Sequence, residues 1–322
     1  MRFLFLLLIL VTTVIARSRP TQHTYVPLPK KQVGIYTLLA DDYEEGFDTN
    51  ATDWEPLLHP YMQEAPNVLY FTFINPENMI VPPSFQKLAA TRGTGAVGSV
   101  PADTVILFAL GGYAYSVKIN PWPFLTSREA AQEMAVKVAA WPDLYGCDGI
   151  DLDIEEGAGE TVESGANMIH FINKIKELNP NMIISQPVYG YPQIQAEIDV
   201  VNHSWDADGT PLGLAQAIGI MVYHSTSSLK YVANYADAST KPDSHPIKVD
   251  VPRNSILLGC SGSASSSAVH TLANEAVKQD LMGVMVWMAS VINGFSYGGD
   301  GDASTSPTTI QALIEARAIL DP

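Results

Sequence analysis

Three acidic residues, Asp151, Asp153 and Glu155, stand at every second position of the stretch CDGIDLDIEEG, which runs from Cys147 to Gly157. Aliphatic residues fill the positions between them. Alternation with a period of two is the pattern of a β-strand, and it places the three carboxylates on one face, about 7 Å apart. Because stacked like charges repel one another, this spacing indicates a chemical role for the acids.

Crowded carboxylates can carry out two kinds of chemistry. They push the pKa values of their neighbours apart, so that one acid stays protonated near neutral pH and can act as a general acid. They can also bind a divalent cation such as Mg²⁺ or Ca²⁺. Neither a histidine cluster nor calcium-loop spacing accompanies the three acids in the sequence. We therefore favour acid–base catalysis and expect no metal or other cofactor.

Eight apolar runs rich in β-forming residues recur along the chain. They are Val33–Leu39, Val68–Ile74, Thr104–Leu110, Gly149–Ile154, Met182–Pro187, Ala217–Tyr223, Ser255–Gly259 and Leu281–Met288. Helical patterns lie between most of them, most clearly at Ser127–Ala140, Thr161–Leu178, Ser266–Gln279 and Pro307–Ala318. Apolar strands that alternate with amphipathic helices predict a parallel sheet covered by helices.

Eight such strands in 322 residues favour an α/β fold with one (β/α)₈ TIM barrel. A doubly wound open sheet is the alternative, but no glycine-rich phosphate loop follows the first run. Active residues of a barrel lie at the C-terminal ends of its strands. The three acids would then point into the barrel and climb towards its mouth, with Glu155 uppermost. Asp148 has the opposite parity, so we interpret it as structural support.

The acidic stretch also resembles the signature of a known family. DGIDLDIE, Asp148 to Glu155, is similar to the D-G-x-D-x-D-x-E motif of glycoside hydrolase family 18, the chitinases and related endo-β-N-acetylglucosaminidases. LFALGGYAYS, Leu107 to Ser116, resembles the strand-three S-x-G-G element. IMVYH, Ile220 to His224, resembles the strand-six M-x-Y motif, and GVMVWMAS, Gly283 to Ser290, the strand-eight tryptophan motif. The resemblance extends over about residues 33–320.

The resemblance implies a role for each acid. In this family the 2-acetamido oxygen of the substrate is the nucleophile, so the enzyme supplies an acid and a group that orients the acetamide. Glu155 would be the general acid and later the base for water. Asp153 would hold the acetamide nitrogen and stabilise the oxazolinium-like intermediate, and Asp151 could share a proton with Asp153. Tyr223 would donate a hydrogen bond to the acetamide oxygen, and Met221 would line its pocket.

Four further residues belong to the expected substrate site. By the same resemblance, Trp287 would form the floor under the sugar, although a tryptophan in an apolar strand is more often part of the core. Gly111 and Gly112 would let the third strand end close to the ligand. His224 is a departure, because many family members have Asp or Asn after the tyrosine. It would either replace a hydrogen bond to the substrate or simply end the strand.

The first residues of the chain predict export. Met1–Ala16 combines a basic start, an apolar run and small residues before a polar stretch, as in a cleaved signal peptide. The run is shorter than the ~20 residues that a membrane span needs, so we expect no span in the mature protein. We predict a lead-in at residues 17–32 and a catalytic barrel at 33–322, secreted or within the secretory or lysosomal pathway. The sequons at Asn50 and Asn202 are candidate glycosylation sites.

Charge and cysteine content limit the classes of partner and the cross-links that we expect. The net charge of −16 disfavours nucleic acid and anionic membranes and fits a neutral or cationic substrate. Only two cysteines, Cys147 and Cys260, are present, and we expect them to be buried thiols at opposite ends of their strands rather than a disulfide. We expect a monomer.

Three functions fit the resemblance. The first is a secreted family-18 hydrolase that cleaves β-1,4 bonds between N-acetylglucosamine units of chitin or chito-oligosaccharides with retention. The second is an endo-β-N-acetylglucosaminidase on the chitobiose core of N-glycans, and the third, which the intact Glu155 disfavours, is a non-hydrolytic chitin-binding lectin. Between Gly259 and Leu281 there is room for one helix only, so the α+β domain that walls the cleft of many processive chitinases is absent. We therefore predict an open groove and endo-acting cleavage.

Overall fold

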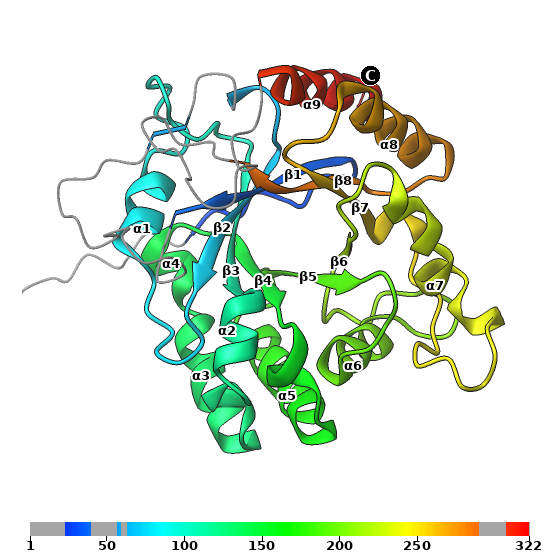
Figure 1. Cartoon of the computed structure of the whole chain (residues 1–322). Coiled ribbons are helices and arrows are strands. Elements are labelled where there is room, and N and C mark those ends of the chain that lie inside the picture. The colour runs from blue at the N-terminus through cyan, green and yellow to red at the C-terminus, as the bar shows by residue number, and fades with distance from the viewer. Residues whose placement is uncertain (1–22, 40–56, 59–62, 290–306, 322) are drawn as a thin grey trace, which may run out of the picture.

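The computed structural model describes residues 23–39, 57–58, 63–289 and 307–321 and contains a closed barrel of eight parallel strands in chain order (Figure 1). The strands are β1 (Gln32–Leu38), β2 (Val68–Ile74), β3 (Val105–Gly111), β4 (Gly149–Asp153), β5 (Ile183–Tyr189), β6 (Ala217–Met221), β7 (Ile256–Ser261) and β8 (Gly283–Ala289). The predicted (β/α)₈ barrel is confirmed, and each strand lies within two residues of its predicted bounds. The predicted signal peptide and Asn50 lie outside the described residues.

Helices surround the barrel. They are α1 (Pro83–Ala90), α2 (Tyr113–Lys118), α3 (Arg128–Val138), α4 (Trp141–Tyr145), α5 (Val162–Leu178), α6 (Gln195–Ser204), α7 (Ala233–Ala236), α8 (Ser266–Lys278) and α9 (Pro307–Leu320). The four clearest predicted helices are confirmed as α3, α5, α8 and α9. Helices α1, α2 and α4 were not predicted, because five to eight residues are too few to display a helical period. No helix in the described ranges is long and apolar enough to cross a membrane.

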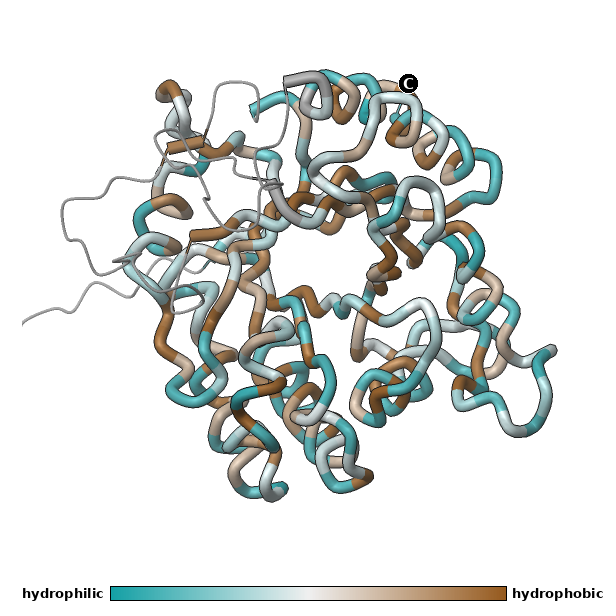
Figure 2. The backbone as a smooth tube through the Cα atoms, in the orientation of Figure 1, coloured by the Kyte–Doolittle hydropathy of each residue, from teal (hydrophilic) through white to brown (hydrophobic). Residues whose placement is uncertain are grey.

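The alternating pattern of β4 divides its side chains as predicted. Ile150, Leu152 and Ile154 are buried in the layer between the barrel and its helices, where each contributes about 1.5–3 kcal/mol by leaving water. Asp151 and Asp153 point the other way, into the barrel, and are also buried. Figure 2 shows the wider pattern, with hydrophobic residues on the strands and polar residues on the outer turns of the helices.

Asp148 anchors the base of β4, in agreement with its interpretation as structural support. One of its carboxylate oxygens accepts hydrogen bonds from Arg92 and from the backbone N–H of Ile106. The other lies 3.0 Å from His23 Nε2 and accepts from the N–H of Val26 at 3.0 Å. The carboxylate thus ties the segment before β1 to the end of the barrel opposite the mouth.

The connection from β7 to β8 contains α8 and no inserted domain, as predicted. Ser265 caps the helix, since its hydroxyl accepts the N–H of Ala268.

Cys147 and Cys260 are buried free thiols, as expected.

Candidate active site

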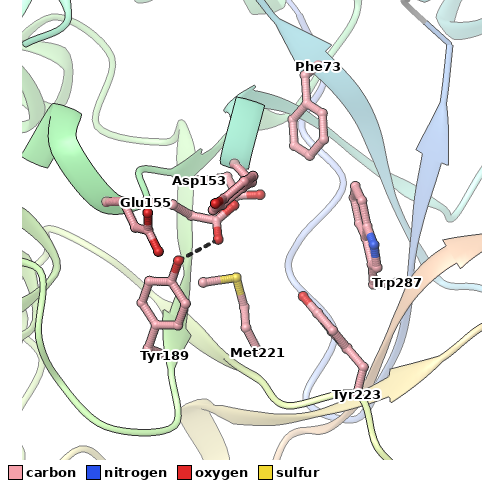
Figure 3. A pocket seen from close by; sticks show the side chains of 9 residues that line it. Phe73, Asp153, Glu155, Tyr189, Met221, Tyr223 and Trp287 are labelled. Carbon is pink, nitrogen blue, oxygen red and sulfur yellow. Dashed lines mark hydrogen bonds between the residues drawn. The ribbon is translucent and has the colours of Figure 1, made fainter. Parts of the chain in front are cut away.

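A pocket of about 370 Å³ opens at the C-terminal ends of the strands (Figure 3). Its lining residues come from or directly follow β2, β3, β4, β5, β6 and β8. They are Phe73, Tyr113, Asp153, Glu155, Glu156, Tyr189, Met221, Tyr223 and Trp287. Five residues proposed from the sequence, Asp153, Glu155, Met221, Tyr223 and Trp287, therefore meet in one pocket.

Asp151 lies beneath this pocket and is held by side chains of two other strands, β1 across the barrel and the adjacent β5. The hydroxyl of Tyr36 on β1 donates to Asp151 Oδ2 at 2.9 Å, and the hydroxyl of Ser185 on β5 donates to Oδ1. Tyr36 is itself stacked on Tyr70, with ring centroids 4.3 Å apart. Burial raises the pKa of Asp151 to about 7, although the two hydrogen bonds lower it. Near neutral pH this carboxyl group can therefore both hold and release a proton.

Asp153 lines the pocket and is buried. It is 5% exposed, and its Oδ1 is buried without a hydrogen-bond partner. Burial, followed by the charges of Glu155, Asp151 and Glu197, raises the pKa of Asp153 well above its usual range. A buried polar atom without a partner costs free energy, so Oδ1 is available to an N–H donor of a bound ligand.

Glu155 follows β4 and reaches the pocket at its rim. Its backbone N–H donates to Ser116 Oγ on α2 at 2.9 Å, which fixes the direction of the chain. Its Oε2 accepts a hydrogen bond from the hydroxyl of Tyr189 at 2.8 Å. Burial raises the pKa of Glu155 to about 7, against the lowering effect of the Tyr189 hydrogen bond. A carboxylic acid with this pKa is suited to donating a proton near neutral pH.

Tyr223 follows β6 and stays protonated over a wide pH range. Burial and the charges of Asp153 and Glu155 raise the pKa of Tyr223 well above its usual range. Its phenol can therefore act as a hydrogen-bond donor in the pocket beside the acids.

An aromatic wall faces the acids across the pocket. Trp287 lies against Phe73, with ring centroids 5.5 Å apart, and against Tyr36, at 5.8 Å. In Figure 3 Phe73 and Trp287 stand on the far side of the pocket from Tyr189 and Glu155. Aromatic faces of this kind pack against the apolar faces of sugar rings, which leaves the polar side of a ligand to the acids.

Gly111 and Gly112 lie beside the pocket rather than in its lining. Both have left-handed backbone conformations, with φ of +95° and +80°. A Cβ on Gly111 would lie 2.4 Å from the carbonyl oxygen of Asp153, and one on Gly112 would lie 2.8 Å from the ring of Phe73. The two glycines therefore let β3 end tightly against β4 and Phe73.

His224 and Asn202 are not brought into the pocket. His224 is exposed and lines a neighbouring cavity of about 280 Å³ with serines of the β7–α8 connection. Asn202 lies in α6, where its Nδ2 donates to the carbonyl oxygen of Pro246 and its Oδ1 accepts from the N–H of Lys248. Substrate contact by His224 and a glycan on Asn202 remain predictions.

Sequence reasoning missed several residues of the site. They are Tyr36, Phe73, Tyr113, Glu156, Ser185 and Tyr189. Tyr189 stands at the end of β5, two residues beyond Pro187, the predicted end of that strand. Its position in sequence, at the C-terminal end of a barrel strand, was the signal that could have found it.

The described residues contain no cluster of three or more His, Cys, Asp or Glu side chains that could hold a metal ion. Tyrosine and serine hydroxyls donate hydrogen bonds to Asp151 and Glu155, whereas Asp153 Oδ1 has no hydrogen-bond partner.

No protein-family model matches the sequence, and no curated protein sequence does. Solved structures do match. A chitinase from Rhizomucor miehei superimposes with a TM-score of 0.58 at 13% identity, over 89% of this chain and 100% of the other. The fold is that of family-18 chitinases. A family-18 chitinase from Flavobacterium johnsoniae gives a TM-score of 0.57 at 14% identity, over 90% and 94% of the two chains.

A chitinase-like agglutinin from Robinia pseudoacacia has the same fold. It gives a TM-score of 0.57 at 11% identity, over 88% of this chain and 99% of that one. Because chitinases and an agglutinin share the architecture, the fold alone does not decide between hydrolysis and binding.

Proposed function

We propose that this protein is a secreted glycoside hydrolase that cleaves β-1,4 linkages between N-acetylglucosamine units by substrate-assisted, retaining hydrolysis. The observation that carries the proposal is the meeting of Glu155, with a pKa of about 7, and the unpartnered Oδ1 of Asp153 in one pocket. The first can supply a proton and the second can accept an N–H. Binding alone needs no proton donor, so Glu155 favours the hydrolase over the lectin.

In the proposed reaction, Glu155 protonates the glycosidic oxygen as the bond to C1 of the sugar breaks. The acetamide oxygen of the same sugar attacks C1 and forms a cyclic oxazolinium-like intermediate. Asp153 accepts the acetamide N–H and stabilises the positive charge, while Tyr223 donates to the acetamide oxygen and orients it. Glu155, now a carboxylate, takes a proton from water, which attacks C1 as the bond from C1 to the acetamide oxygen breaks. The acetamide is regenerated, and the second inversion restores the original anomeric configuration.

Incubation with chito-oligosaccharides and with a high-mannose glycopeptide tests the proposal. We expect mass spectrometry to show cleavage of the chito-oligosaccharides, unchanged by EDTA, because acetamide-assisted cleavage needs no metal. Cleavage of the glycopeptide alone would assign the protein to the endo-β-N-acetylglucosaminidases. Binding of the oligosaccharides without cleavage of either substrate would identify a lectin, and activity that EDTA removes and Mg²⁺ or Ca²⁺ restores would contradict the acid–base roles.

We further propose that cleavage is endo-acting. The β7–β8 connection holds only α8, so it provides no wall that would close the groove into a tunnel. An open groove admits a chain at its middle and releases it after one cut.

With a soluble chitin derivative, viscosity should therefore fall early, well ahead of the release of reducing ends. A steady release of disaccharide with nearly constant viscosity would instead indicate processive cleavage from chain ends, even if the catalytic roles are right.

A further inference from the structure

Tyr189, the last residue of β5, connects the acid at the rim to two helices. Its hydroxyl donates to Glu155 Oε2 at 2.8 Å (Figure 3). Burial, followed by the charge of Glu155, raises the pKa of Tyr189. The phenol therefore keeps its proton and remains a donor throughout the range in which Glu155 titrates.

The backbone of Tyr189 is held on both sides. Its N–H donates to Glu197 Oε1 on α6 at 3.2 Å, and its carbonyl oxygen accepts the hydroxyl of Tyr235 on α7 at 2.5 Å. The carbonyl oxygen of the next residue, Gly190, accepts from Asn234 Nδ2 at 2.8 Å. A strand can end without side-chain hydrogen bonds of this kind. We therefore interpret these three bonds as holding Tyr189, and with it the phenol, in place.

Glu197 lies in the first turn of α6, where acidic residues are common, but its burial is unusual for a carboxyl group. It is 1% exposed, and its Oε2 is buried without a hydrogen-bond partner. Burying a carboxyl group costs free energy, and packing α6 against the barrel requires only an apolar side chain at this place. The hydrogen bond that its Oε1 accepts from the N–H of Tyr189 explains why a carboxyl group is buried at this position.

We propose that Tyr189 is a positioning residue for Glu155: it fixes one carboxyl oxygen so that the other carries the transferable proton, and Glu197 and Tyr235 fix Tyr189 in turn. This inference rests on the proposed function in that it names the group that orients the general acid. The hydrogen bond itself can be tested without any substrate.

The groups that face Glu155 determine whether loss of the Tyr189 hydrogen bond raises or lowers the pKa of Glu155. Asp153 on β4, Glu156 in the short turn Glu156–Gly159, and Glu197 on α6 are acidic, and Tyr223 after β6 is a neutral phenol. Burial and the charge of Glu156 raise the pKa of Glu155, whereas the hydrogen bond from Tyr189 lowers it. Loss of that bond should therefore raise it further. A general acid works only while protonated, so the alkaline fall in rate should move to higher pH.

The test is a carboxyl titration of Tyr189→Phe against the wild type. Protein carrying ¹³C in its glutamate carboxyl groups is titrated by NMR, and the Glu155 signal is assigned by its absence in Glu155→Gln. We expect the Glu155 midpoint to rise by about one pH unit in Tyr189→Phe, since a hydrogen bond to a charged group is lost. Tyr191→Phe, at an exposed position in the same connection, is the matched control and should leave the midpoint unchanged. An unchanged midpoint in Tyr189→Phe would overturn the inference.

Two variants of Glu197 test the support of Tyr189. Glu197→Gln keeps an oxygen that can accept the Tyr189 N–H and should titrate like the wild type. Glu197→Ala removes the acceptor and should move the Glu155 midpoint in the same direction as Tyr189→Phe. Equal midpoints in Glu197→Ala and the wild type would remove Glu197 from this role.

The pH profile of kcat/KM on a chito-oligosaccharide separates this inference from the proposed function. If both hold, the alkaline limb of Tyr189→Phe moves by the same interval as the NMR midpoint. If the wild type hydrolyses the substrate and that limb stays in place, Tyr189 does not act on the acid step. If the wild type is inactive, the proposed function fails, whereas the NMR titration still decides whether Tyr189 positions Glu155.

Discussion

Replacing Glu155 by glutamine should lower kcat by about 10²–10⁴-fold, the usual contribution of a general acid, while the fold and the binding of chito-oligosaccharides are retained. The substitution removes the proton that the leaving oxygen needs in the transition state and spares contacts made in the ground state. The amide oxygen of glutamine can still accept the hydroxyl of Tyr189, which holds Oε2 at 2.8 Å in the wild type. The side chain should therefore keep its place.

Steady-state kinetics and calorimetric titration with a chito-oligosaccharide measure the two halves of this prediction. Glu160→Gln, which neutralises an exposed glutamate just beyond the site, is the matched control for the loss of one charge. If Glu155→Gln kept more than about a tenth of the wild-type kcat, which is far above what loss of a general acid allows, Glu155 would not be the acid.

The barrel could be predicted from the sequence because its strands are buried on both faces. A strand such as Val68–Ile74, buried at every position, reads as an uninterrupted apolar run bounded by polar residues. Short helices such as α4 (Trp141–Tyr145) carry no such signal, because their place is set by packing against the barrel.

Features of the site that arise within one strand could be predicted from the sequence, whereas contacts between two strands could not. The positions of Asp151 and Asp153 followed from alternation along β4 alone. The bond from Ser185 to Asp151 depends on the register between β4 and β5, which sets these two residues opposite each other, and the sequence does not contain that register. The same holds for Tyr36, which reaches Asp151 across the barrel from β1.

The place of His224 could have been inferred. In an extended segment successive side chains point to opposite faces, so a Tyr223 that enters the pocket directs its neighbour away from it. The structure places His224 accordingly, exposed and in the adjoining cavity. Strand geometry thus predicts the direction of this side chain, which resemblance to a motif does not.

Replacing Asp153 by asparagine should lower kcat by about 10²–10³-fold, as the loss of one preorganised electrostatic contact does. Asparagine cannot become the carboxylate that stabilises the positive charge of the oxazolinium-like intermediate, although it keeps the shape of the side chain. A thiazoline analogue of that intermediate should inhibit the wild type and bind Asp153→Asn more weakly. Equal binding to the two proteins would remove Asp153 from this role.

The same substitution should make the protein more stable at neutral pH. Burial and the neighbouring charges raise the pKa of Asp153 well above its unfolded value, which is near 4. The folded state therefore binds more protons than the unfolded state between these two pKa values, and stability falls as pH rises through that interval. Asparagine has no proton to lose. Its advantage should be absent near pH 4 and grow by up to about 1.4 kcal/mol for each pH unit above it, until the folded pKa is reached.

Urea denaturation of Asp153→Asn and the wild type at a series of pH values measures this difference. Asp208→Asn, which neutralises an exposed aspartate, is the control and should show no such trend. A stability gain that grows with pH, together with a lost kcat, would show that Asp153 is kept for chemistry at the expense of the fold. If Asp153→Asn were destabilised equally at every pH, the carboxylate would be a structural group instead, and its burial beside Glu155 and Asp151 would need another explanation.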